Sequence, residues 1–552
     1  MNTHIALKIA GMTCTHCAVT VDKALRAVPG VVDAVVKFPE GKAWVTAAAP
    51  VPTDVLLAAV EGAGYGAELA DMDPAVAGRS MAPSPSAGAG IHVAIIGSGS
   101  AAFACAIRAV EGGARVSMIE SGVLGGTCVN VGCVPSKIFI RAAQMAHWQR
   151  AHPFPGLGHG EPTVNRPALL AQQQGRVEEL RQGKYAHVLA AHPDIAFFPG
   201  RARFQDQNTL VVHAADGGQQ RLTADRFLIA TGAHPHLPAI PGLEKTPYWT
   251  STEALLAEDL PAHLLVLGGS VVAVELAQAF RRLGTEVTIL ARTTLLSKDA
   301  PDLGTGLEAV FREEGIQVWK HTLPQSVRYE GGSFIVQIGQ STLRSDRLLV
   351  ATGRTPSTQG LGLKGAGVLT DQTGAIVVDD HLRTSVPHIF AAGDCTNHPQ
   401  FVYVAAAGGT RAAVNMLGGD DALDLRIMPA VVFTDPQVAT VGIDERGAQR
   451  LGLAVESRTL TLDNVPRALA NFDTRGFIKL VAEQGTGRLL GAQILAAEGG
   501  EIIQAAALAM RGGLTIQDLA TQLFPYLTMV EGIKLCAQTF TKDVKELSCC
   551  AG

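Results

Sequence analysis

Short apolar runs alternate with amphipathic stretches along the chain, a pattern that predicts a mixed α/β protein. In residues 1–69, the β-type runs HIALKIA, VVDAVVKF and KAWVTAA are separated by helical patterns near 15–28 and 53–63. With a last strand expected near 66–70, this order predicts a small ferredoxin-like βαββαβ module. The next segment, 70–90, is rich in Pro, Ala, Ser and Gly, so we expect a flexible linker.

Two related strand–turn–helix–strand units follow. The first, IHVAIIGSGSAAFACAIRAVEGGARVSMIE, covers 91–120, and the second, LLVLGGSVVAVELAQAFRRLGTEVTILAR, covers 264–292. Each is followed later by a strand and an ATG turn, FLIATGAHP at 227–235 and LLVATGRTP at 348–356. Paired units of this kind predict two Rossmann-like α/β domains, one inserted into the other.

The pattern changes again near the C-terminus. The strands VVFTDP and GFIKLVAE precede helical patterns at 498–511 and 530–540, an order that predicts a separate α+β domain. The expected boundaries are 1–69 for the small module, 70–90 for the linker, 91–247 with 346–424 for the first α/β domain, 248–345 for the second, and 425–552 for the C-terminal domain.

Composition excludes several classes of function. Of the 552 residues, 47% are hydrophobic and 17% charged, and a net charge of −5 gives no basic surface for nucleic acid or anionic lipid. No signal peptide and no clean run of 18 apolar residues are visible, so we expect a cytoplasmic protein. Nine cysteines, an odd number, do not indicate a secreted disulfide scaffold.

The first α/β unit carries a dinucleotide-binding pattern. Gly97-x-Gly99-x-x-Ala102 follows an apolar strand and opens a helix, so the backbone can approach a pyrophosphate at the helix N-terminus. Glu120 ends the next strand, where a carboxylate can hold ribose hydroxyls. Strand, helix and acid together predict a bound dinucleotide.

The second unit is a degenerate version, Gly268-x-Ser270-x-x-Ala273. Its second strand ends in Ala291, where an acid is expected, and Arg292 follows. Loss of the acid and gain of a guanidinium suit a 2′-phosphate, which favours NADPH over NADH. The alternative is an arginine that is merely solvated at a strand end.

Two cysteines, Cys128 and Cys133, lie in the segment GGTCVNVGCVPSK. Their spacing predicts two thiols on adjacent turns of a helix start, where the helix dipole lowers the pKa of a thiol. A structural zinc site would need two further ligands nearby, and the sequence supplies none.

This segment, with AAGD at 391–394, resembles the FAD-dependent pyridine nucleotide–disulfide oxidoreductases, the family of glutathione reductase and dihydrolipoyl dehydrogenase. The resemblance covers residues 91–552 and implies an FAD domain, an NADPH domain and a dimerisation domain, in that order. It places FAD on Gly97, Gly99, Ala102, Glu120, Gly126, Thr127, Lys137, Thr231, Gly232 and Asp394. It places NADPH on Gly268, Ser270, Ala273 and Arg292.

The same resemblance implies roles for the two thiols. Cys133 would be the charge-transfer thiol near the flavin, and Cys128 the outer thiol that exchanges with substrate. Lys137 would lie by the flavin and pair with Glu275. Hydride would pass from NADPH to flavin, and electrons from flavin to the Cys128–Cys133 disulfide.

One departure from the family concerns the substrate. Disulfide reductases of this family carry a His-Pro-Thr…Glu segment whose His–Glu pair serves the exchanging thiol as acid and base. This chain reads LFPYLTMVE at 523–531, with Phe524 where the His is expected, followed by Pro525 and Tyr526. A phenyl ring cannot shuttle protons, so ordinary dithiol exchange is disfavoured.

The chain ends ELSCCAG, which places Cys549 and Cys550 side by side. Neighbouring cysteines constrain the chain very little, so the pair is interpreted as a clamp for a soft metal ion that delivers it to the active site. The alternative is an exposed thiol pair without function.

The N-terminal module carries a further thiol pair in GMTCTHC. Cys14 and Cys17 follow a strand and precede a helix, and the segment resembles the heavy-metal-associated domain of copper chaperones and metal-pumping ATPases. A thioredoxin-type redox pair is the competing interpretation. His16, between the two thiols, is expected to be solvated.

Taken together, these features resemble the mercury-detoxifying members of the flavoprotein family. They imply NADPH-dependent reduction of Hg(II) to elemental mercury in a homodimer with a shared active site. The ion, free, bound to small thiols or received from a membrane transporter, would pass from Cys14 and Cys17 to the partner's terminal pair and then to the inner pair. Tyr526 and Tyr185 would line the pocket.

Two rival functions stay open. One is an NADPH-dependent disulfide or dihydrolipoyl oxidoreductase with an accessory metal domain, and the other is a metal buffer whose flavoprotein part keeps its own thiols reduced. The three remaining cysteines, Cys105, Cys395 and Cys536, have no partner at motif spacing and are expected to be buried and inert.

Overall fold

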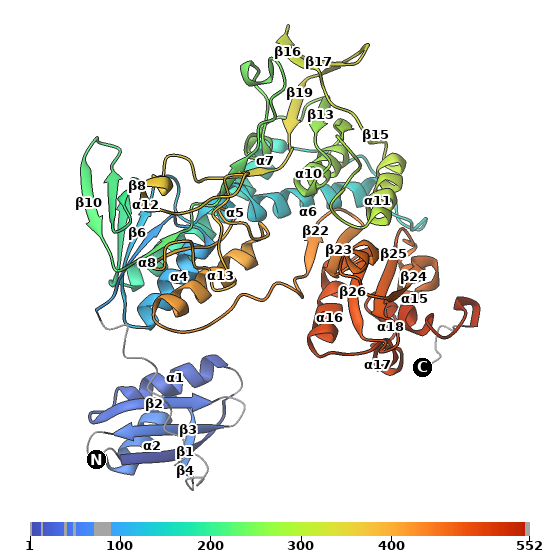
Figure 1. Ribbon diagram of the computed structural model, residues 1–552. Helices are drawn as coiled ribbons and strands as arrows, with labels where there is room; N and C mark the ends of the chain where they lie inside the picture. Colours follow the sequence, from blue (N-terminus) through green and yellow to red (C-terminus); the bar gives the residue numbers. More distant parts are fainter. Residues whose placement is uncertain (1–2, 13–14, 38–40, 48–50, 71–89, 547–552) are drawn as a thin grey trace. The chain divides into compact units, whose positions relative to one another are not determined.

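The computed structural model describes residues 3–12, 15–37, 41–47, 51–70 and 90–546. The chain forms two compact units, Met1–Ser86 and Ala87–Gly552 (Figure 1). Most of the predicted linker lies outside the described residues, as do Cys14, Cys549 and Cys550.

The small unit has the predicted βαββαβ order. Its elements are β1 Thr3–Ala10, α1 Thr15–Arg26, β2 Val31–Lys37, β3 Lys42–Ala47, α2 Thr53–Gly62 and β4 Gly66–Leu69. The strands form an antiparallel sheet of order β2-β3-β1-β4. Leu7 of β1, Leu25 of α1 and Leu56 of α2 are fully buried in one cluster, so both helices cover the same face. The ferredoxin-like prediction is confirmed.

The larger unit begins with a five-stranded parallel sheet of order β21-β11-β5-β6-β7. Its strands are β5 His92–Ile96, β6 Arg115–Glu120, β7 Ile195–Pro199, β11 Arg226–Ile229 and β21 Ile389–Ala391. The last of these, β21, comes from far along the chain. The strands of the second sheet therefore lie in the sequence between β11 and β21. A three-stranded antiparallel sheet is attached, with β8 Arg201–Asp206, β9 Thr209–His213 and β10 Gln219–Thr223.

The second sheet is also parallel, with order β15-β14-β13-β19. Its strands are β13 His263–Leu267, β14 Glu286–Leu290, β15 Gln317–Trp319 and β19 Arg347–Val350, flanked by the antiparallel β16 Ser326–Glu330, β17 Ser333–Ile338 and β18 Ser341–Ser345. The two ATG connectors meet, because β12 Ala233–Pro235 pairs with β20 Arg354–Pro356. The inserted arrangement follows from this strand order.

Helices connect these strands. They are α4 Ser100–Glu111, α5 Gly126–Val131, α6 Cys133–Ala151, α7 Arg166–Arg181, α8 His187–Ala191, α9 Ser251–Leu256, α10 Val271–Arg282, α11 Pro301–Glu313, α12 Leu363–Ala366 and α13 Val402–Met416. A π-helical turn, Gln182–Ala186, separates α7 from α8. Across the part of the chain that the structure describes, no helix is long and apolar enough to cross a membrane.

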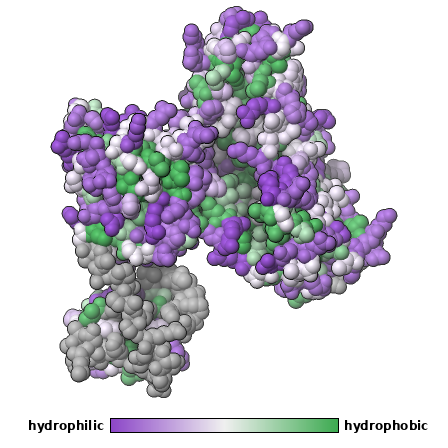
Figure 2. Space-filling model, viewed as in Figure 1, coloured by the Kyte–Doolittle hydropathy of each residue, from purple (hydrophilic) through white to green (hydrophobic). Residues whose placement is uncertain are grey.

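The C-terminal domain is an antiparallel sheet of order β22-β23-β26-β25-β24 covered by helices. Its strands are β22 Ala430–Val432, β23 Gln437–Gly442, β24 Val455–Thr461, β25 Phe477–Glu483 and β26 Leu489–Ala496. Its helices are α14 Glu445–Arg450, α15 Pro466–Asn471, α16 Gly499–Arg511, α17 Ile516–Thr521 and α18 Glu531–Gln538. Apolar side chains are visible in the hollow between this domain and the parallel sheets (Figure 2).

A buried ion network joins the second parallel sheet to the C-terminal domain. Arg282, at the end of α10, pairs through Nη2 with Glu314 Oε1 at 2.6 Å and through Nη1 with Asp435 Oδ2 at 2.8 Å. The Arg282 side chain is only 3% exposed. Because unpaired buried charges are costly, this network fixes how the two parts dock.

Replacing Arg282 with Met should therefore destabilise the larger unit, because Asp435 would lose its ion pair and Glu314 would keep only the more distant Arg475, at 3.7 Å. We expect a loss of about 3–5 kcal/mol in the free energy of unfolding, measured by urea denaturation. Arg328→Met, which removes an exposed pair with Glu330 at 3.2 Å, is the control and should cost less than about 1 kcal/mol. Equal losses in the two variants would contradict this account.

Candidate active site

The first glycine turn follows β5, and its backbone packs directly against the backbone that follows β11. Gly97 has φ +116°, and a Cβ there would lie 2.3 Å from the Ala230 carbonyl oxygen. Gly99 is the N-cap of α4 and gives it no side-chain cap, so the first N–H groups of the helix are left for a ligand. Such an N-terminus suits a pyrophosphate.

The carboxylate expected beside this turn is in place. Glu120 ends β6, accepts a hydrogen bond from the Ser98 hydroxyl on Oε2 at 2.7 Å, and accepts one from the Gly122 N–H on Oε1 at 2.6 Å. These bonds fix the carboxylate beside the glycine turn. The arrangement fits the ribose and pyrophosphate of a dinucleotide.

A second acid, Asp394, lies beyond the end of β21. Its carboxylate is 25% exposed, and Arg354 Nε lies 3.9 Å from Oδ2. Burial raises the pKa of Asp394, and the Arg354 guanidinium opposes that rise. Arg354 was not among the residues expected from the sequence, although it follows the second ATG turn directly. The pair places polar groups of both signs at this end of the first parallel sheet.

The second glycine turn repeats the geometry of the first. A Cβ at Gly268 would lie 2.2 Å from the Ala351 carbonyl oxygen, and the Ser270 hydroxyl donates to the same oxygen at 3.2 Å. Ser270 leaves α10 without a side-chain cap. Ala291 is buried at the end of β14, and Arg292 is exposed beside it. An open helix N-terminus with an exposed guanidinium fits a nucleotide that carries a 2′-phosphate.

Cys128 and Cys133 lie in two successive helices, which corrects the expectation of a single helix start. Cys128 is in α5, and Cys133 is the first residue of α6. Gly132 separates the helices with φ −123° and ψ −116°, and a Cβ there would lie 2.9 Å from the Thr127 carbonyl oxygen. The chain can fold back this closely only where a side chain is lacking.

The two thiols differ strongly in acidity. The Cys128 thiol donates a hydrogen bond to the Cys133 sulfur, and this bond, with the nearby Lys137 cation, lowers the pKa of Cys133 to about 7. The pKa of Cys128 is raised well above its usual range, chiefly by the same bond to Cys133 and by burial. Near pH 7, therefore, a large share of the reduced pairs hold a Cys133 thiolate beside a Cys128 thiol, and this share grows as the pH rises.

The ion pair expected between Lys137 and Glu275 is present. Lys137 Nζ lies 2.8 Å from Glu275 Oε2, and the Glu275 side chain is only 5% exposed. The other carboxylate oxygen accepts a hydrogen bond from the Phe433 N–H at 2.9 Å, and Lys137 Nζ lies 4.5 Å from the centroid of the Phe433 ring. Phe433, which the sequence did not single out, brings the C-terminal domain to the site.

Tyr185 lies beside the dithiol although it is more than 50 residues away in sequence. It belongs to the π-helical turn after α7, and its ring meets that of Phe103 edge-on at 4.9 Å. Burial raises the pKa of Tyr185, and negative charge on the Cys128–Cys133 pair raises it further, so the phenol keeps its proton. The Ser100 side chain is its hydrogen-bond partner.

Tyr526 occupies a different environment. It is 55% exposed and lies between α17 and α18, which Figure 1 shows in the part of the C-terminal domain remote from α5. Phe524 packs partly buried against the core of that domain. The buried Glu531 accepts a hydrogen bond from the Leu527 N–H at 3.1 Å. Within one chain, Tyr526 is therefore far from Cys128 and Cys133.

The other cysteines divide into two groups. Cys105, Cys395 and Cys536 are buried as predicted, and burial raises the pKa of these thiols to about 12, 11 and 12. Cys14, Cys549 and Cys550 lie outside the described residues, and of Cys17 only its place in α1 is described.

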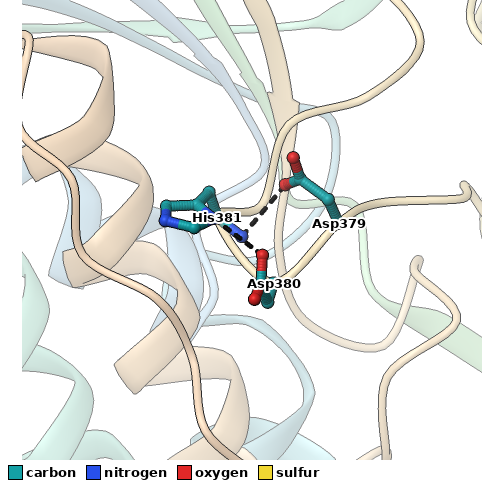
Figure 3. A group of neighbouring side chains, drawn as sticks. All are labelled: Asp379, Asp380 and His381. Atoms are coloured by element: carbon teal, nitrogen blue, oxygen red, sulfur yellow. Dashed lines mark hydrogen bonds and ion pairs between the residues drawn. The ribbon is translucent and has the colours of Figure 1, made fainter.

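A group of possible metal ligands lies elsewhere, at Asp379, Asp380 and His381 (Figure 3). His381 Nδ1 lies 2.7 Å from Asp380, and Nε2 lies 2.9 Å from Asp420. Asp379 accepts hydrogen bonds from the N–H groups of His381 and Arg383. These contacts tie a loop to the segment after α13, which accounts for the cluster as a structural feature.

Comparison with known proteins follows the same division of the chain. Residues 91–409 match the pyridine nucleotide-disulphide oxidoreductase family, and residues 428–537 match the dimerisation domain of that family. Residues 6–66 match the heavy-metal-associated domain. The family resemblances inferred from the sequence are thereby confirmed.

Individual relatives are similar over the whole chain. The mercuric reductase of Acidithiobacillus ferrooxidans is 58% identical and covers 100% of both chains, and that of Shigella flexneri is 58% identical over 99% of this chain and 100% of its own. The Cu(II) complex of the HOCl-induced flavoprotein disulfide reductase RclA from Escherichia coli is 30% identical, with a TM-score of 0.74 over 82% of this chain and 99% of that chain. The chain thus belongs to the mercuric reductases, within the pyridine nucleotide-disulphide oxidoreductases.

Proposed function

We propose that Cys128 and Cys133 are the residues on which this protein reduces Hg(II) to elemental mercury with electrons from NADPH. The observation that carries the proposal is the pair itself, two hydrogen-bonded sulfurs in which Cys128 and the Lys137 cation lower the pKa of Cys133. Thiolates bind soft metal ions strongly, and two sulfurs suit an ion that prefers linear coordination. When the ion binds, Cys128 gives up its proton and the pair becomes two thiolate ligands.

The two nucleotide sites fit the cofactors of the family. We place FAD on Gly97, Gly99, Ala102, Glu120, Gly126, Thr127, Lys137, Thr231, Gly232 and Asp394, and NADPH on Gly268, Ser270, Ala273 and Arg292. FAD held there would supply hydride-transfer chemistry: two electrons from a first NADPH would open the disulfide, and two from a second NADPH would reduce the bound ion. Lys137, held by Glu275, keeps positive charge next to the Cys133 thiolate, and Tyr185 presents a protonated phenol to the dithiol.

The assignment predicts an NADPH oxidation that depends on Hg(II). Purified enzyme with excess small thiol should oxidise NADPH when Hg(II) is added, and Cys133→Ser should lower that rate by at least on the order of 1,000-fold, because the ion would lose a ligand and the pair its redox function. Cys105→Ser, at a buried thiol, is the matched control and should keep the rate. A comparable rate with glutathione disulfide or lipoamide would instead support the rival disulfide oxidoreductase.

The acidity of Cys133 gives a pH prediction. Because the pKa of Cys133 is lowered to about 7, its thiolate signal in the reduced enzyme should rise with pH and be half-complete near pH 7. Lys137→Met removes the stabilising cation and should raise this midpoint by about one pH unit. Glu275→Gln removes a negative charge that raises the pKa of Cys133, so it should lower the midpoint.

Thiolate absorbance followed against pH measures this midpoint in each variant. Lys364→Met, which changes an exposed lysine on α12, is the control and should leave the midpoint unchanged. Equal midpoints in Lys137→Met, Glu275→Gln and the unchanged enzyme would contradict the electrostatic account.

We further propose that the active site is shared between the two subunits of a homodimer. Tyr526, 55% exposed, lies in a segment remote from α5 of its own chain, and Leu523 of the same segment is 87% exposed. Exposed apolar surface on a dimerisation domain is the surface that a second subunit would cover. Tyr526 would then line the pocket of the partner, and Cys549 and Cys550 would reach it from the same end of the chain.

The proposed route of the ion has three steps. Cys14 and Cys17 of the small unit would capture it in the cytoplasm, from small-thiol complexes or from a membrane transporter. Cys549 and Cys550 would pass it on, and Cys128 with Cys133 would receive it. Each transfer exchanges one thiolate for another, so the ion is never without a sulfur ligand.

The route predicts a defect that depends on how the ion is supplied. Cys549→Ala/Cys550→Ala should lower kcat/KM by about tenfold or more for Hg(II) bound to excess glutathione, because the exchanging thiolates are lost. Cys14→Ala/Cys17→Ala serves as the comparison at the other thiol pair. Mixed dimers of the terminal variant and Cys128→Ala/Cys133→Ala should recover part of the activity. Full activity of the terminal variant on thiol-bound Hg(II) would refute the route.

A further inference from the structure

We propose that Asn130 and Arg181 are positioning residues that hold Tyr185 beside the Cys128–Cys133 pair. The inference rests on the proposed role of that pair in Hg(II) reduction and extends the site to a neighbouring helix. It assigns a function to two side chains that form an interaction between α5 and α7, and to the π-helical turn that follows α7.

Asn130 holds the start of the redox helix. It lies in α5 between the two cysteines and is only 8% exposed. Its Nδ2 donates to the carbonyl oxygens of Leu124 at 2.9 Å and Gly126 at 2.8 Å, across the turn from which α5 begins. Because both amide protons are used here, the buried Oδ1 needs a donor from elsewhere.

Arg181 supplies that donor. Its Nη1 donates to Asn130 Oδ1 at 3.1 Å, while Nη2 pairs with Glu178 one turn earlier in α7. Gln182 Nε2 donates to the same carboxylate at 2.7 Å. Arg181 is the last residue of α7, so the end of this helix is tied to the amide that shapes the redox turn.

The chain makes its π-helical turn directly after this anchor. The turn, Gln182–Ala186, has one residue more than an α-helical turn, and this extra residue changes the direction in which Tyr185 points relative to α7. The ring packs edge-on against Phe103, and a Cβ at Gly125 would lie only 3.3 Å from it. Tyr185 is thus placed from two sides, by its ring contacts and by the Arg181 anchor.

The consequence for the reaction is specific. The anchor fixes the Tyr185 phenol beside the outer thiol, and it does so through Asn130, which also bonds the turn before Cys128. Arg181→Met leaves the Asn130 bonds to the Leu124 and Gly126 carbonyls in place, so the phenol would be misplaced while the turn that carries Gly126 is kept. Reduction of Hg(II) should therefore suffer, whereas electron transfer from NADPH to an acceptor that does not need the thiols should not.

The test compares two arginines of the same helix in the full-length enzyme. Arg181→Met removes the link to Asn130. Arg176→Met removes an exposed ion pair, Arg176 Nη1 to Glu179 Oε2 at 2.7 Å, whose two residues are three positions apart, as are Arg181 and Glu178. We expect kcat/KM for Hg(II) to fall about tenfold in Arg181→Met, because one hydrogen bond from a charged group is lost. In Arg176→Met, kcat/KM should stay unchanged. NADPH oxidation with ferricyanide should be equal in both, and Arg181→Lys should recover part of the loss.

A double-mutant cycle shows whether Arg181 acts through Tyr185. In a Tyr185→Phe background, Arg181→Met should cause no further loss. Fully additive losses, or an Arg181→Met enzyme that behaves like Arg176→Met, would overturn the proposal. Melting temperature and FAD content verify folding, and Arg181→Leu is the second variant if Arg181→Met folds poorly.

The same variants separate this inference from the proposed function. If Tyr185→Phe leaves Hg(II) reduction unchanged while Cys133→Ser abolishes it, the positioning role fails and the role of the dithiol stands. If Cys133→Ser still reduces Hg(II), the proposed function itself fails.

Discussion

The carboxylate of Glu275 is buried, and three parts of the larger unit meet at it. One oxygen pairs with Lys137 on the redox side, the other accepts the Phe433 N–H of the C-terminal domain, and the residue itself belongs to α10 beside the second nucleotide site. A buried carboxylate is tolerable only if both oxygens are satisfied, so removing either partner disturbs more than one domain. The position of Lys137 follows from this requirement.

Lys137 in turn sets the chemistry of the dithiol. Its ammonium pairs with the Glu275 carboxylate at 2.8 Å, and its charge, with the hydrogen bond from Cys128, lowers the pKa of Cys133. The buried thiols behave in the opposite way: burial without a nearby cation raises the pKa of Cys105 to about 12. Reactivity therefore depends on a nearby charge and a hydrogen bond from a second thiol. A cysteine without these neighbours is not reactive in this way.

Local pattern was sufficient to predict much of this architecture. Apolar periodicity gave the βαββαβ order of the small unit, and glycine turns after apolar strands marked both nucleotide sites. The pairing of Lys137 with Glu275 came from family resemblance, since 138 positions separate the two residues. The break between α5 and α6 could not be predicted, because helix-start signals do not show how closely Gly132 approaches Thr127.

The position of Tyr185 and the contacts of Asn130 and Arg181 were beyond reach of the sequence for a different reason. A π-helical turn has no clear sequence signature, and it depends on contacts formed only after α5 and α7 have packed. The network around Arg282 is of the same kind, since its acidic partners come from 32 and 153 positions further along. Such contacts depend on tertiary structure, which a pattern of local preferences does not encode.

The aromatic segment near Phe524 fits the chemistry of a metal ion better than that of a disulfide. A disulfide substrate leaves as thiolates that need protons, so an acid–base group next to the exchanging thiol is useful. A neutral mercury atom needs no proton to leave. Two electrons convert Hg(II) to neutral mercury, both metal–sulfur bonds break, and two thiolates remain, of which Cys128 regains from solvent the proton that it gave up when the ion bound. Under this scheme, a phenol that keeps its proton, as Tyr185 does, is compatible with turnover. A histidine in place of Phe524 would have no leaving thiolate to protonate.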